Sequence, residues 1–245
     1  MLTVVSITRD DLPGIQRTIC STRSLRTDSR VSQIVVDSSS EIVREAVRDM
    51  VSREASVRYV WVEPHGISPA FNMGLAESQS KWIWFLNGGD VVHPLLDQEL
   101  LLGLLAASRA DALIFDLERE DGAVPRHPPM YSLWPPLLHW IPHPATIVQR
   151  EPLLAVGGFR EDFRIAMDGE LWIRLFGQGY VADLVSFPIA KFAPGGASRS
   201  PEVYQEISRF IRLHHKSLIK RWLQNGRMIL GAWRHARKGS RGAPR

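Results

Sequence analysis

Residues 82–90, WIWFLNGGD, join five consecutive apolar residues to a turn that contains two glycines and ends in an acid. A short apolar run with an abrupt polar stop is typical of a buried β-strand. Three more strands of this kind are predicted upstream, at 2–8 (LTVVSIT), 33–37 (QIVVD) and 57–62 (VRYVWV).

Helices are predicted between these strands, and the third has a clear start signal. Ser68 is a natural N-cap, and Pro69 would then occupy the first helical position. The three helices are expected at 11–25, 41–53 and 69–79. Strands that alternate with helices in this way indicate an α/β fold, a mostly parallel sheet with helices on both faces.

Polar residues gather at the predicted carboxyl ends of these strands, where ligands bind in open α/β sheets. These residues are Thr8, Asp37, Glu63 and the segment 87–90. A ligand site at this edge of the sheet is therefore predicted from the strand pattern alone.

The chain after residue 90 has a looser pattern. Residues 120–144 are rich in Pro, His and Trp, and an irregular stretch of this length is typical of a functional loop. The other elements predicted are helices at 94–107, 151–156 and 167–177, strands at 111–116, 145–150 and 180–187, and a Gly/Ser-rich loop at 191–200. Within 167–177, the residues expected to face the core are Leu171, Trp172 and Leu175.

Composition limits the class of protein. Cys20 is the one cysteine among 245 residues, which excludes a disulfide framework and a cysteine-rich zinc site. The first residues, MLTVVSITRDDLPG, do not resemble a signal peptide, and no apolar run approaches the roughly 20 residues of a spanning helix. We therefore expect a protein of a reducing compartment that is neither secreted nor transmembrane.

Charge is distributed unevenly along the chain. Glu206 is the last acid, and eleven Lys or Arg residues follow it, which leaves 19 basic against 26 acidic residues in the first 206. We therefore expect two parts, a globular domain at 1–200 and a basic, amphipathic helical appendage at 201–245 whose end is disordered. The appendage is expected to lie on an anionic membrane, although a helix docked on the body with a solvated basic face is an alternative. Nucleic acid is not expected as a partner, because no recognition motif accompanies the basic residues.

Five motifs together resemble a known family. They are VVDSSS at 35–40, EPHGISPAFNMG at 63–74, FLNGGD at 85–90, PHPATIVQR at 142–150 and GGFREDFRIAMDGELWIRL at 157–175. Their order and spacing are similar to those of the inverting GT-A-fold glycosyltransferases of family 2, with most similarity to the colanic-acid-type bacterial branch. The resemblance covers roughly residues 2–200.

The resemblance implies an activity. A sugar would pass from a nucleotide-sugar donor of the UDP or GDP type to a hydroxyl of a glycan or a lipid-linked acceptor, in synthesis of a bacterial surface polysaccharide or glycolipid. It also implies a Mn²⁺ or Mg²⁺ ion as cofactor, inversion at the sugar, and work in the cytoplasm at the inner face of the membrane.

The catalytic base and the metal ligands follow from the same resemblance. Asp168 falls on the family's base, which takes the proton of the acceptor hydroxyl. Asp90 and His143 are the expected metal ligands, with Asn87 in place of an acid of the fuller metal motif. From local sequence alone, Asp168 could equally be a charge that complements the helix dipole, and residues 87–90 could be a plain turn. His143 could likewise be a structural histidine with its hydrogen bonds satisfied.

The remaining predicted site residues would bind the donor. They are Thr8, Asp37, Glu63, Gly66, Asn72, Asn87, Gly88 and Gly89. The glycines of the turn would let the backbone approach the phosphates, and Gly66 would permit a tight turn over the nucleotide. Asp37 could instead be a turn acid, and Asn72 could be a helix-face hydrogen-bonding residue.

Two rival functions are weighed against this enzyme. A non-catalytic nucleotide-binding or scaffold member of a glycan-assembly complex is suggested by Asn87 and by the short SSSE segment at 38–41. A dinucleotide-binding oxidoreductase is disfavoured, because TRDDLPG follows the first strand where G-x-G-x-x-G would be needed.

Overall fold

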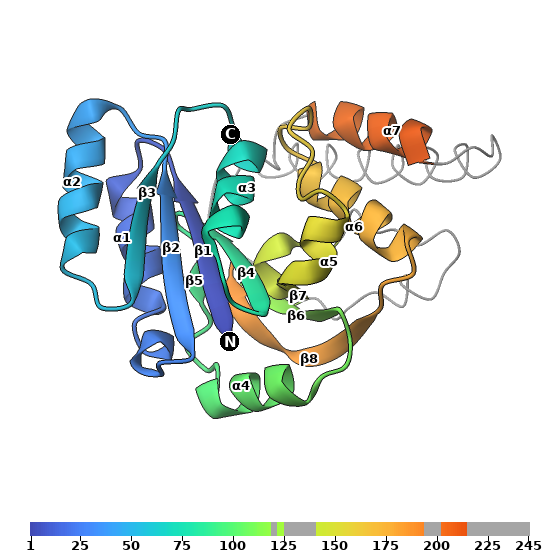
Figure 1. Ribbon diagram of the computed structural model, residues 1–245, viewed down its shortest axis with the longest axis horizontal. Coiled ribbons are helices and arrows are strands. Elements are labelled where there is room, and N and C mark those ends of the chain that lie inside the picture. The colour runs from blue at the N-terminus through green and yellow to red at the C-terminus, as the bar shows by residue number, and fades with distance from the viewer. Residues whose placement is uncertain (119–121, 125–140, 194–201, 215–245) are drawn as a thin grey trace, which may run out of the picture.

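A single mixed sheet of eight strands forms the centre of the protein, in the order β3-β2-β1-β4-β7-β6-β8-β5 (Figure 1). The computed structural model describes residues 1–118, 122–124, 141–193 and 202–214. The first four strands are parallel, with Thr8 of β1 opposite Asp37 of β2 and Ile7 opposite Asn87 of β4. Their bounds are β1 Leu2–Thr8, β2 Val31–Asp37, β3 Val57–Trp61 and β4 Trp82–Asn87.

The helices of this half follow the predicted alternation. They are α1 Leu12–Ser21, α2 Glu41–Ser52 and α3 Ile67–Glu77, with a short 3-10 helix, η1, at Leu25–Thr27. The predicted helix at 11–25 therefore ends early. At its end the Ser21 and Thr22 hydroxyls donate to the carbonyls of Thr18 and Ile19, at 2.7 and 2.9 Å.

Two strands run against the others in the second half of the sheet. β7 is antiparallel to both β4 and β6, and β5 is antiparallel to β8. The mostly parallel sheet is confirmed with these two exceptions, of which β5 was not predicted. The elements of this half are β5 Val91–Val92, α4 Gln98–Ala107, β6 Ala112–Glu118, η4 His143–Ala145, β7 Thr146–Gln149, α5 Arg150–Ala155, α6 Met167–Gly177, β8 Ala182–Lys191 and α7 Glu202–His214.

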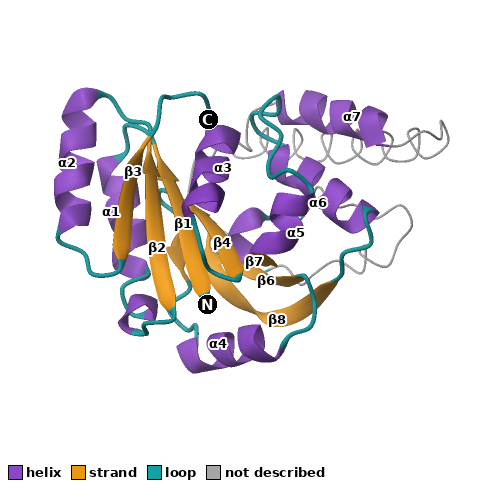
Figure 2. Cartoon of the chain, viewed as in Figure 1, coloured by secondary structure: helices purple, strands orange, loops and turns teal. Residues whose placement is uncertain are grey.

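Helices cover both faces of the sheet, as predicted (Figure 2). Successive strand residues point to opposite faces, so that Val5 packs beneath α3 while Val35 packs beneath α1 and α2. The largest core joins α3, α5, α6 and α7 to one face, and a second core packs α4 against the opposite face. Leu171, Trp172 and Leu175 are fully buried, as the pattern of this helix predicts.

Two predicted helix starts are wrong. α3 begins at Ile67 with Gly66 as its N-cap, and Ser68 lies inside the helix, where its hydroxyl donates to the carbonyl of Phe163 at 3.0 Å. A distant carbonyl thus outcompetes the local cap. α4 begins at Gln98 rather than at 94, because the Asp97 carboxylate caps it by accepting from the N–H of Leu100 at 3.0 Å.

The beginning of the predicted appendage belongs to the packed body. Ile207, Phe210 and Ile211 of α7 are buried in the largest core, and α7 lies against α6. The rest of the predicted appendage, 215–245, and most of the predicted loop 120–144 lie outside the described residues. Across the part of the chain that the structure describes, no helix combines the length and apolarity needed to cross a bilayer.

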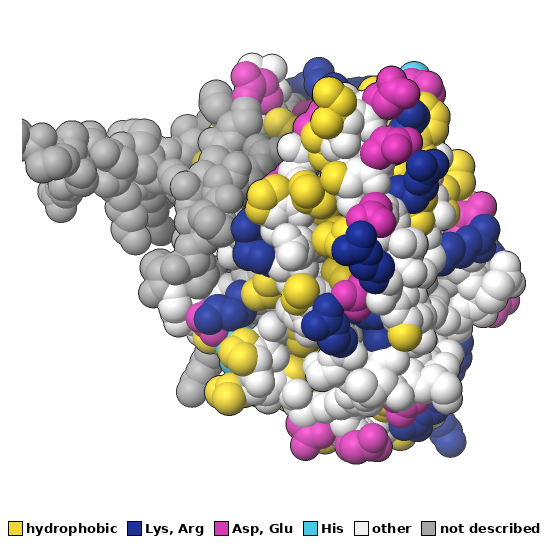
Figure 3. Space-filling model, turned by 90° about the vertical axis from the view of Figure 1, so that its left-hand side faces the viewer, with side chains coloured by type: hydrophobic (Ala, Val, Ile, Leu, Met, Phe, Trp, Pro, Cys, Tyr) yellow, Lys and Arg dark blue, Asp and Glu magenta, His cyan; other side chains and the backbone are white. Residues whose placement is uncertain are grey.

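The surface over α2 carries both signs of charge. Figure 3 views the molecule from that side and shows Lys and Arg side chains interspersed with Asp and Glu. Arg48 pairs with Glu45 at 3.0 Å and Arg53 pairs with Asp49 at 2.6 Å. The basic side chains of α2 are therefore neutralised by their own helix.

Candidate active site

The turn that follows β4 is held by close backbone contacts. The N–H of Gly88 donates to the carbonyl of Ile7 at 2.8 Å, and the N–H of Asp90 donates to that of Asn87 at 3.1 Å. A Cβ on Gly88 would lie 3.1 Å from the Ile7 oxygen, and Gly89 has φ of +104°, which other residues rarely adopt. Both glycines are thus needed by the turn itself.

One side chain that the sequence did not single out organises this turn. The Thr18 hydroxyl accepts from the N–H of Gly89 at 2.9 Å and lies 2.7 Å from the carbonyl oxygen of Asp90 and 3.2 Å from that of Asn87. Thr18 lies on the buried face of α1 with Ile15 and Ile19, fully buried. A threonine among the isoleucines of an amphipathic helix was the available signal.

Asp90 is almost completely buried, with 1% of its surface exposed. Its Oδ1 atom accepts from the N–H of Ala193 at 2.8 Å, while Oδ2 has no hydrogen-bond partner among the described residues. Burial raises the pKa of this carboxyl, against the N–H of Ala193 and the nearby His143. A buried carboxylate oxygen without a donor fits a hard divalent cation, which prefers oxygen ligands.

His143 joins two of the predicted site residues. Its Nε2 atom lies 3.0 Å from Nδ2 of Asn87, and its Nδ1 atom lies 3.4 Å from Oδ2 of Asp168. An amide nitrogen donates, so this placement of the Asn87 amide assigns the acceptor role to Nε2 and the ring proton to Nδ1, facing Asp168. The ring also meets the edge of Phe71, at 5.4 Å between centroids.

This arrangement bears on the predicted role of His143 as a metal ligand. Both of its nitrogens face protein groups, and the described residues contain no group of three or more His, Cys, Asp or Glu side chains placed to hold an ion. Asn87 Oδ1 and Asp90 Oδ2 are the buried oxygens without partners here. A cation at this position would therefore need further ligands from its substrate, such as phosphate oxygens.

Asp168 is the second residue of α6. Its Oδ1 atom accepts from the N–H of Gly169 at 2.7 Å, and its side chain is 22% exposed. This position is compatible both with a charge that complements the helix dipole and with a catalytic base. The Oδ1 atom accepts from the first turn of the helix, while Oδ2 faces His143. Glu170, the neighbouring acid, is fully buried between Arg174 and His214.

Thr8 and Asp37 lie side by side at the carboxyl ends of β1 and β2. Asp37 is fully buried and accepts from the N–H of Ser39 and from the hydroxyl of Tyr59, both at 2.9 Å. Burial, together with this hydrogen bond, raises the pKa of Tyr59. Asp37 thus supports the local turn, as its alternative interpretation has it, and a nucleotide contact stays a prediction.

The segment 63–74 contains three residues that were predicted to bind the nucleotide-sugar donor, and they differ in solvent exposure. Glu63 and Gly66 are exposed, and Gly66 has φ of +118°. The Asn72 amide accepts from the N–H of Phe159 and donates to its carbonyl, both at 2.8 Å, and also donates to Oε1 of Glu161 at 3.2 Å. Asn72 therefore clamps the loop after α5 to α3, which is the helix-face role of its alternative interpretation.

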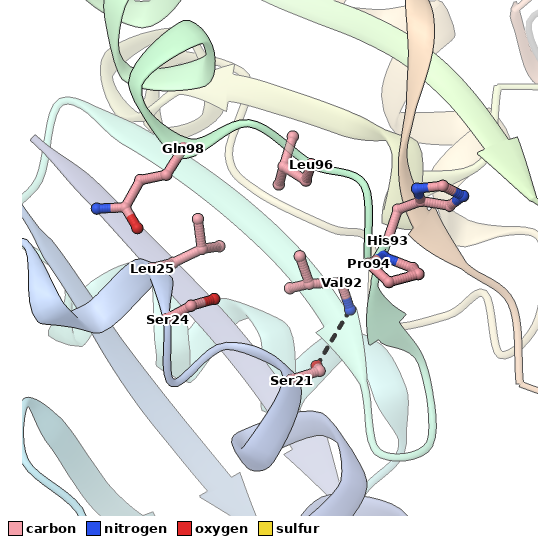
Figure 4. Close-up of a pocket in the computed structure, with 8 residues that line it drawn as sticks. All are labelled: Ser21, Ser24, Leu25, Val92, His93, Pro94, Leu96 and Gln98. Atoms are coloured by element: carbon pink, nitrogen blue, oxygen red, sulfur yellow. Dashed lines mark hydrogen bonds between the residues drawn. The ribbon is translucent and has the colours of Figure 1, made fainter.

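Four predicted site residues thus form one connected group, Asp90, Asn87, His143 and Asp168, although Glu63 and Asn72 lie outside it. A separate cavity of about 290 Å³ lies beside β5 (Figure 4). There the Ser21 hydroxyl accepts from the N–H of Val92 at 3.1 Å. The residues that line this cavity include none of the predicted site residues.

A family model matches more than half of the chain. The model described as "Glycosyl transferase family 2" matches residues 3–160. The chain belongs to glycosyl transferase family 2. The protein is accordingly a glycosyltransferase, and the predicted family is confirmed at this level.

Two relatives of this family-2 glycosyltransferase carry curated names. The uncharacterized glycosyltransferase Rv1514c of Mycobacterium tuberculosis is 31% identical over 186 residues, which span 71% of this chain and 68% of Rv1514c. The O-antigen biosynthesis protein RfbC of Myxococcus xanthus is 30% identical over 135 residues, which span 53% of this chain and only 10% of RfbC. Neither name identifies the branch within the family.

Solved structures share the fold at low identity. S. aureus TarS, residues 1–349 in complex with UDP-GlcNAc, has a TM-score of 0.68 at 14% identity, covering 93% of this chain and 71% of TarS 1–349. The mannosyltransferase PcManGT from Pyrobaculum calidifontis, in complex with GDP-Man and Mn²⁺, has a TM-score of 0.65 at 17% identity, covering 100% of this chain and 76% of its own. The predicted GT-A-type fold is thereby confirmed.

Proposed function

We propose that this glycosyltransferase is a metal-dependent, inverting enzyme that uses a UDP- or GDP-sugar. The observation that carries the proposal is the placement of two carboxylates around His143. Asp90 is buried with an oxygen that has no partner, while Asp168 is part-exposed at 3.4 Å from the same ring. One acid is thus suited to a buried cation and the other to an incoming acceptor.

Asp168 is the proposed catalytic base. It takes the proton of an acceptor hydroxyl as that oxygen bonds to the anomeric carbon, and the bond from that carbon to the diphosphate breaks. The nucleoside diphosphate departs with the electron pair on the face opposite the base, which inverts the sugar. The N–H of Gly169 and the Nδ1–H of His143 hold the carboxylate in place.

Asp90 and Asn87 are the proposed residues for Mn²⁺ or Mg²⁺, with His143 beside them. Such an ion, when bound, would neutralise charge on the diphosphate. The oxygen-rich, buried donor set supports a hard cation, as does the Mn²⁺ named with PcManGT. Gly88 and Gly89 shape the turn that carries both residues.

The nucleotide is proposed to lie over the carboxyl ends of β1 to β3. Thr8, Asp37, Glu63 and Gly66 border this edge, and Asn72 holds the loop at 158–159 against α3. The parallel strands that end here favour this placement. UDP-GlcNAc with TarS and GDP-Man with PcManGT are the donors named for proteins of the same fold.

The acceptor is proposed to be a glycan or lipid-linked hydroxyl in bacterial surface polysaccharide or glycolipid synthesis, in the manner of the colanic-acid-type branch. The name of RfbC, an O-antigen biosynthesis protein, supports this class. Work in the cytoplasm at the inner face of the membrane, with 215–245 on anionic lipid, is part of the same proposal. It rests on the nine basic residues of that segment.

Thermal shifts with UDP, GDP, CDP and dTDP, each with and without Mn²⁺, test the donor site. A ligand that binds the folded state raises the melting temperature by mass action. We expect one nucleotide to do so only with Mn²⁺, and Asp90→Ala to remove the effect. Asp49→Ala, which removes an exposed acid of α2, should keep it.

Three results would contradict the proposal or redirect it. If no nucleotide stabilises the protein, the donor site is wrong. If stabilisation does not need Mn²⁺, the metal dependence is wrong. If a nucleotide binds but no donor is ever turned over, the scaffold function replaces the enzyme.

A further inference from the structure

Glu206, the last acid of the chain, lies at the entrance to the helix that carries Asp168. Its Oε1 atom accepts from the N–H of Arg164, and its Oε2 atom accepts from those of Ile165 and Ala166, all at 2.8 Å. Hydrogen bonds to a charged acceptor are among the stronger ones in proteins. One carboxylate from α7 therefore fixes three consecutive backbone groups.

The start of α6 has no side-chain cap of its own. Ala166 is the N-cap residue of α6 and has no side chain able to accept a hydrogen bond, and α6 starts at Met167. The first N–H groups of a helix need acceptors, and a negative charge near them is favourable. Glu206 binds the three N–H groups that precede the helix, the last of them on Ala166, and so places a negative charge beside the N-terminus of α6, two residues before Asp168.

α7 is itself anchored on the segment before α6 (Figure 1). The ring of Phe210 packs near that of Phe163, at 6.3 Å between centroids, and the Arg209 guanidinium donates to the carbonyl of Asp162 at 2.7 Å. Farther along, His214 contacts Glu170 at 2.8 Å. The position of Glu206 is thus set by contacts of the residues that follow it in α7.

We propose that Glu206 is a positioning residue for the transfer reaction, holding residues 164–166 so that Asp168 meets the acceptor hydroxyl at the correct place. The inference rests on the proposed function of Asp168 and adds α7 to the catalytic unit. It concerns the base alone, because Glu206 touches none of the residues proposed for the cation or the nucleotide.

The physical argument is geometric. Without the Glu206 carboxylate, three N–H groups lose their acceptor and the loop at 164–166 moves to find water. Asp168 would move with it, because only one residue separates it from Ala166. A displacement of about 1 Å of a catalytic group can cost roughly 100-fold in rate while ground-state binding is kept.

The test uses Glu206→Ala and the milder Glu206→Gln, whose one remaining oxygen can accept part of these hydrogen bonds. Release of UDP from UDP-GlcNAc and of GDP from GDP-Man is measured with Mn²⁺, with kcat and KM separated. Hydrogen exchange of the amides at 160–170 is followed alongside. Glu45→Gln on α2, an exposed glutamate paired with Arg48, is the matched control.

We expect kcat to fall about 10- to 100-fold in Glu206→Ala and less in Glu206→Gln, with KM within about twofold of wild type. Amide exchange should quicken at 164–169 and stay unchanged in β1 to β4. Glu45→Gln should match wild type in every measurement. If Glu206→Ala does not fold, the graded loss in Glu206→Gln decides the question.

The experiment distinguishes a failure of the positioning role of Glu206 from a failure of the proposed function. If wild type turns over a donor, Asp168→Asn does not, and both Glu206 variants retain full kcat, the positioning role is wrong while the proposed function stands. A rise in KM at constant kcat also overturns it. If wild type releases neither nucleotide and Asp168→Asn changes nothing, the proposed function fails, and the role of Glu206 fails with it.

Discussion

His143 stands between the two halves of the site, with its Nδ1 atom 3.4 Å from Oδ2 of Asp168 and its Nε2 atom 3.0 Å from Nδ2 of Asn87. β4 ends at Asn87, and α6 carries Asp168. A single buried ring therefore couples the end of the parallel sheet to the helix of the proposed base. A displacement of the turn at Asn87 would therefore move the His143 ring, and with it the contact to Asp168.

Asp168→Asn should abolish transfer while leaving nucleotide binding intact. The amide cannot take up a proton at neutral pH, and loss of a general base costs roughly 10²- to 10⁴-fold. The change is nearly isosteric, so the contact with the N–H of Gly169 can persist. Release of UDP or GDP and the thermal shift by the same nucleotide are the paired measurements. Retained turnover in Asp168→Asn would disprove its role as base.

Thr18→Val should weaken both the fold and nucleotide binding. The hydroxyl holds Gly89 and Asp90 in the turn, and burying these backbone groups without it costs about 1–3 kcal/mol. Nucleotide affinity should fall because the turn carries the proposed cation ligand. Urea unfolding and nucleotide titration by calorimetry measure the two effects.

Thr22→Val is the control for Thr18→Val. Thr22, the C-cap residue of α1, is also fully buried, and its hydroxyl donates to the carbonyl of Ile19 at 2.9 Å. It does not contact the turn at 87–90. We expect a comparable loss of stability with nucleotide affinity unchanged. Equal losses of affinity in the two variants would show that Thr18 acts through general stability alone.

The first half of the fold could be predicted because buried parallel strands are continuous apolar runs. β1 has the bounds predicted for it, and β4 differs by one residue. Asp90 could be proposed because it ends the turn after such a strand, whereas Asp168, the second residue of α6, was proposed from the family motif at 157–175. β5 could not, because two valines carry no periodicity, and its pairing with β8 depends on residues about 100 positions away.

Contacts between distant segments explain which features could not be predicted from the sequence. Thr18 meets Asp90 across 72 positions, and Ser68 leaves its expected cap to reach Phe163 across 95. Glu206 is separated from Ala166 by 40 positions. No local pattern encodes such partners, so helix starts and supporting side chains were the parts most often missed.

Asn72→Ala distinguishes the two interpretations of Asn72. Its amide satisfies both backbone groups of Phe159, so its removal should lower the free energy of unfolding by roughly 1–3 kcal/mol. Nucleotide affinity, measured below the melting temperature, should change little. The opposite result, unchanged stability with a large loss of affinity, would support the direct donor contact that the family motif predicts.

Glu170→Gln should remove a stabilisation that depends on pH. Burial raises the pKa of Glu170, but hydrogen bonds from His214 and Arg174 outweigh it, so the pKa is lowered overall. A carboxyl with a lowered folded-state pKa stabilises the fold fully above its unfolded pKa of about 4.3. That stability is lost as the pH falls through the folded-state value.

The measurement is the free energy of unfolding in urea for wild type and Glu170→Gln at pH 7 and at pH 3. We expect a difference of about 3 kcal/mol at pH 7, because removing one partner of a buried ion pair leaves the Arg174 guanidinium uncompensated. At pH 3 the difference should shrink, since the wild-type carboxyl is then increasingly protonated. Glu45→Gln, at an exposed site, should differ from wild type by less than about 1 kcal/mol at both pH values. A difference for Glu170→Gln that is the same at pH 3 and pH 7 would mean that packing, not charge, explains its effect.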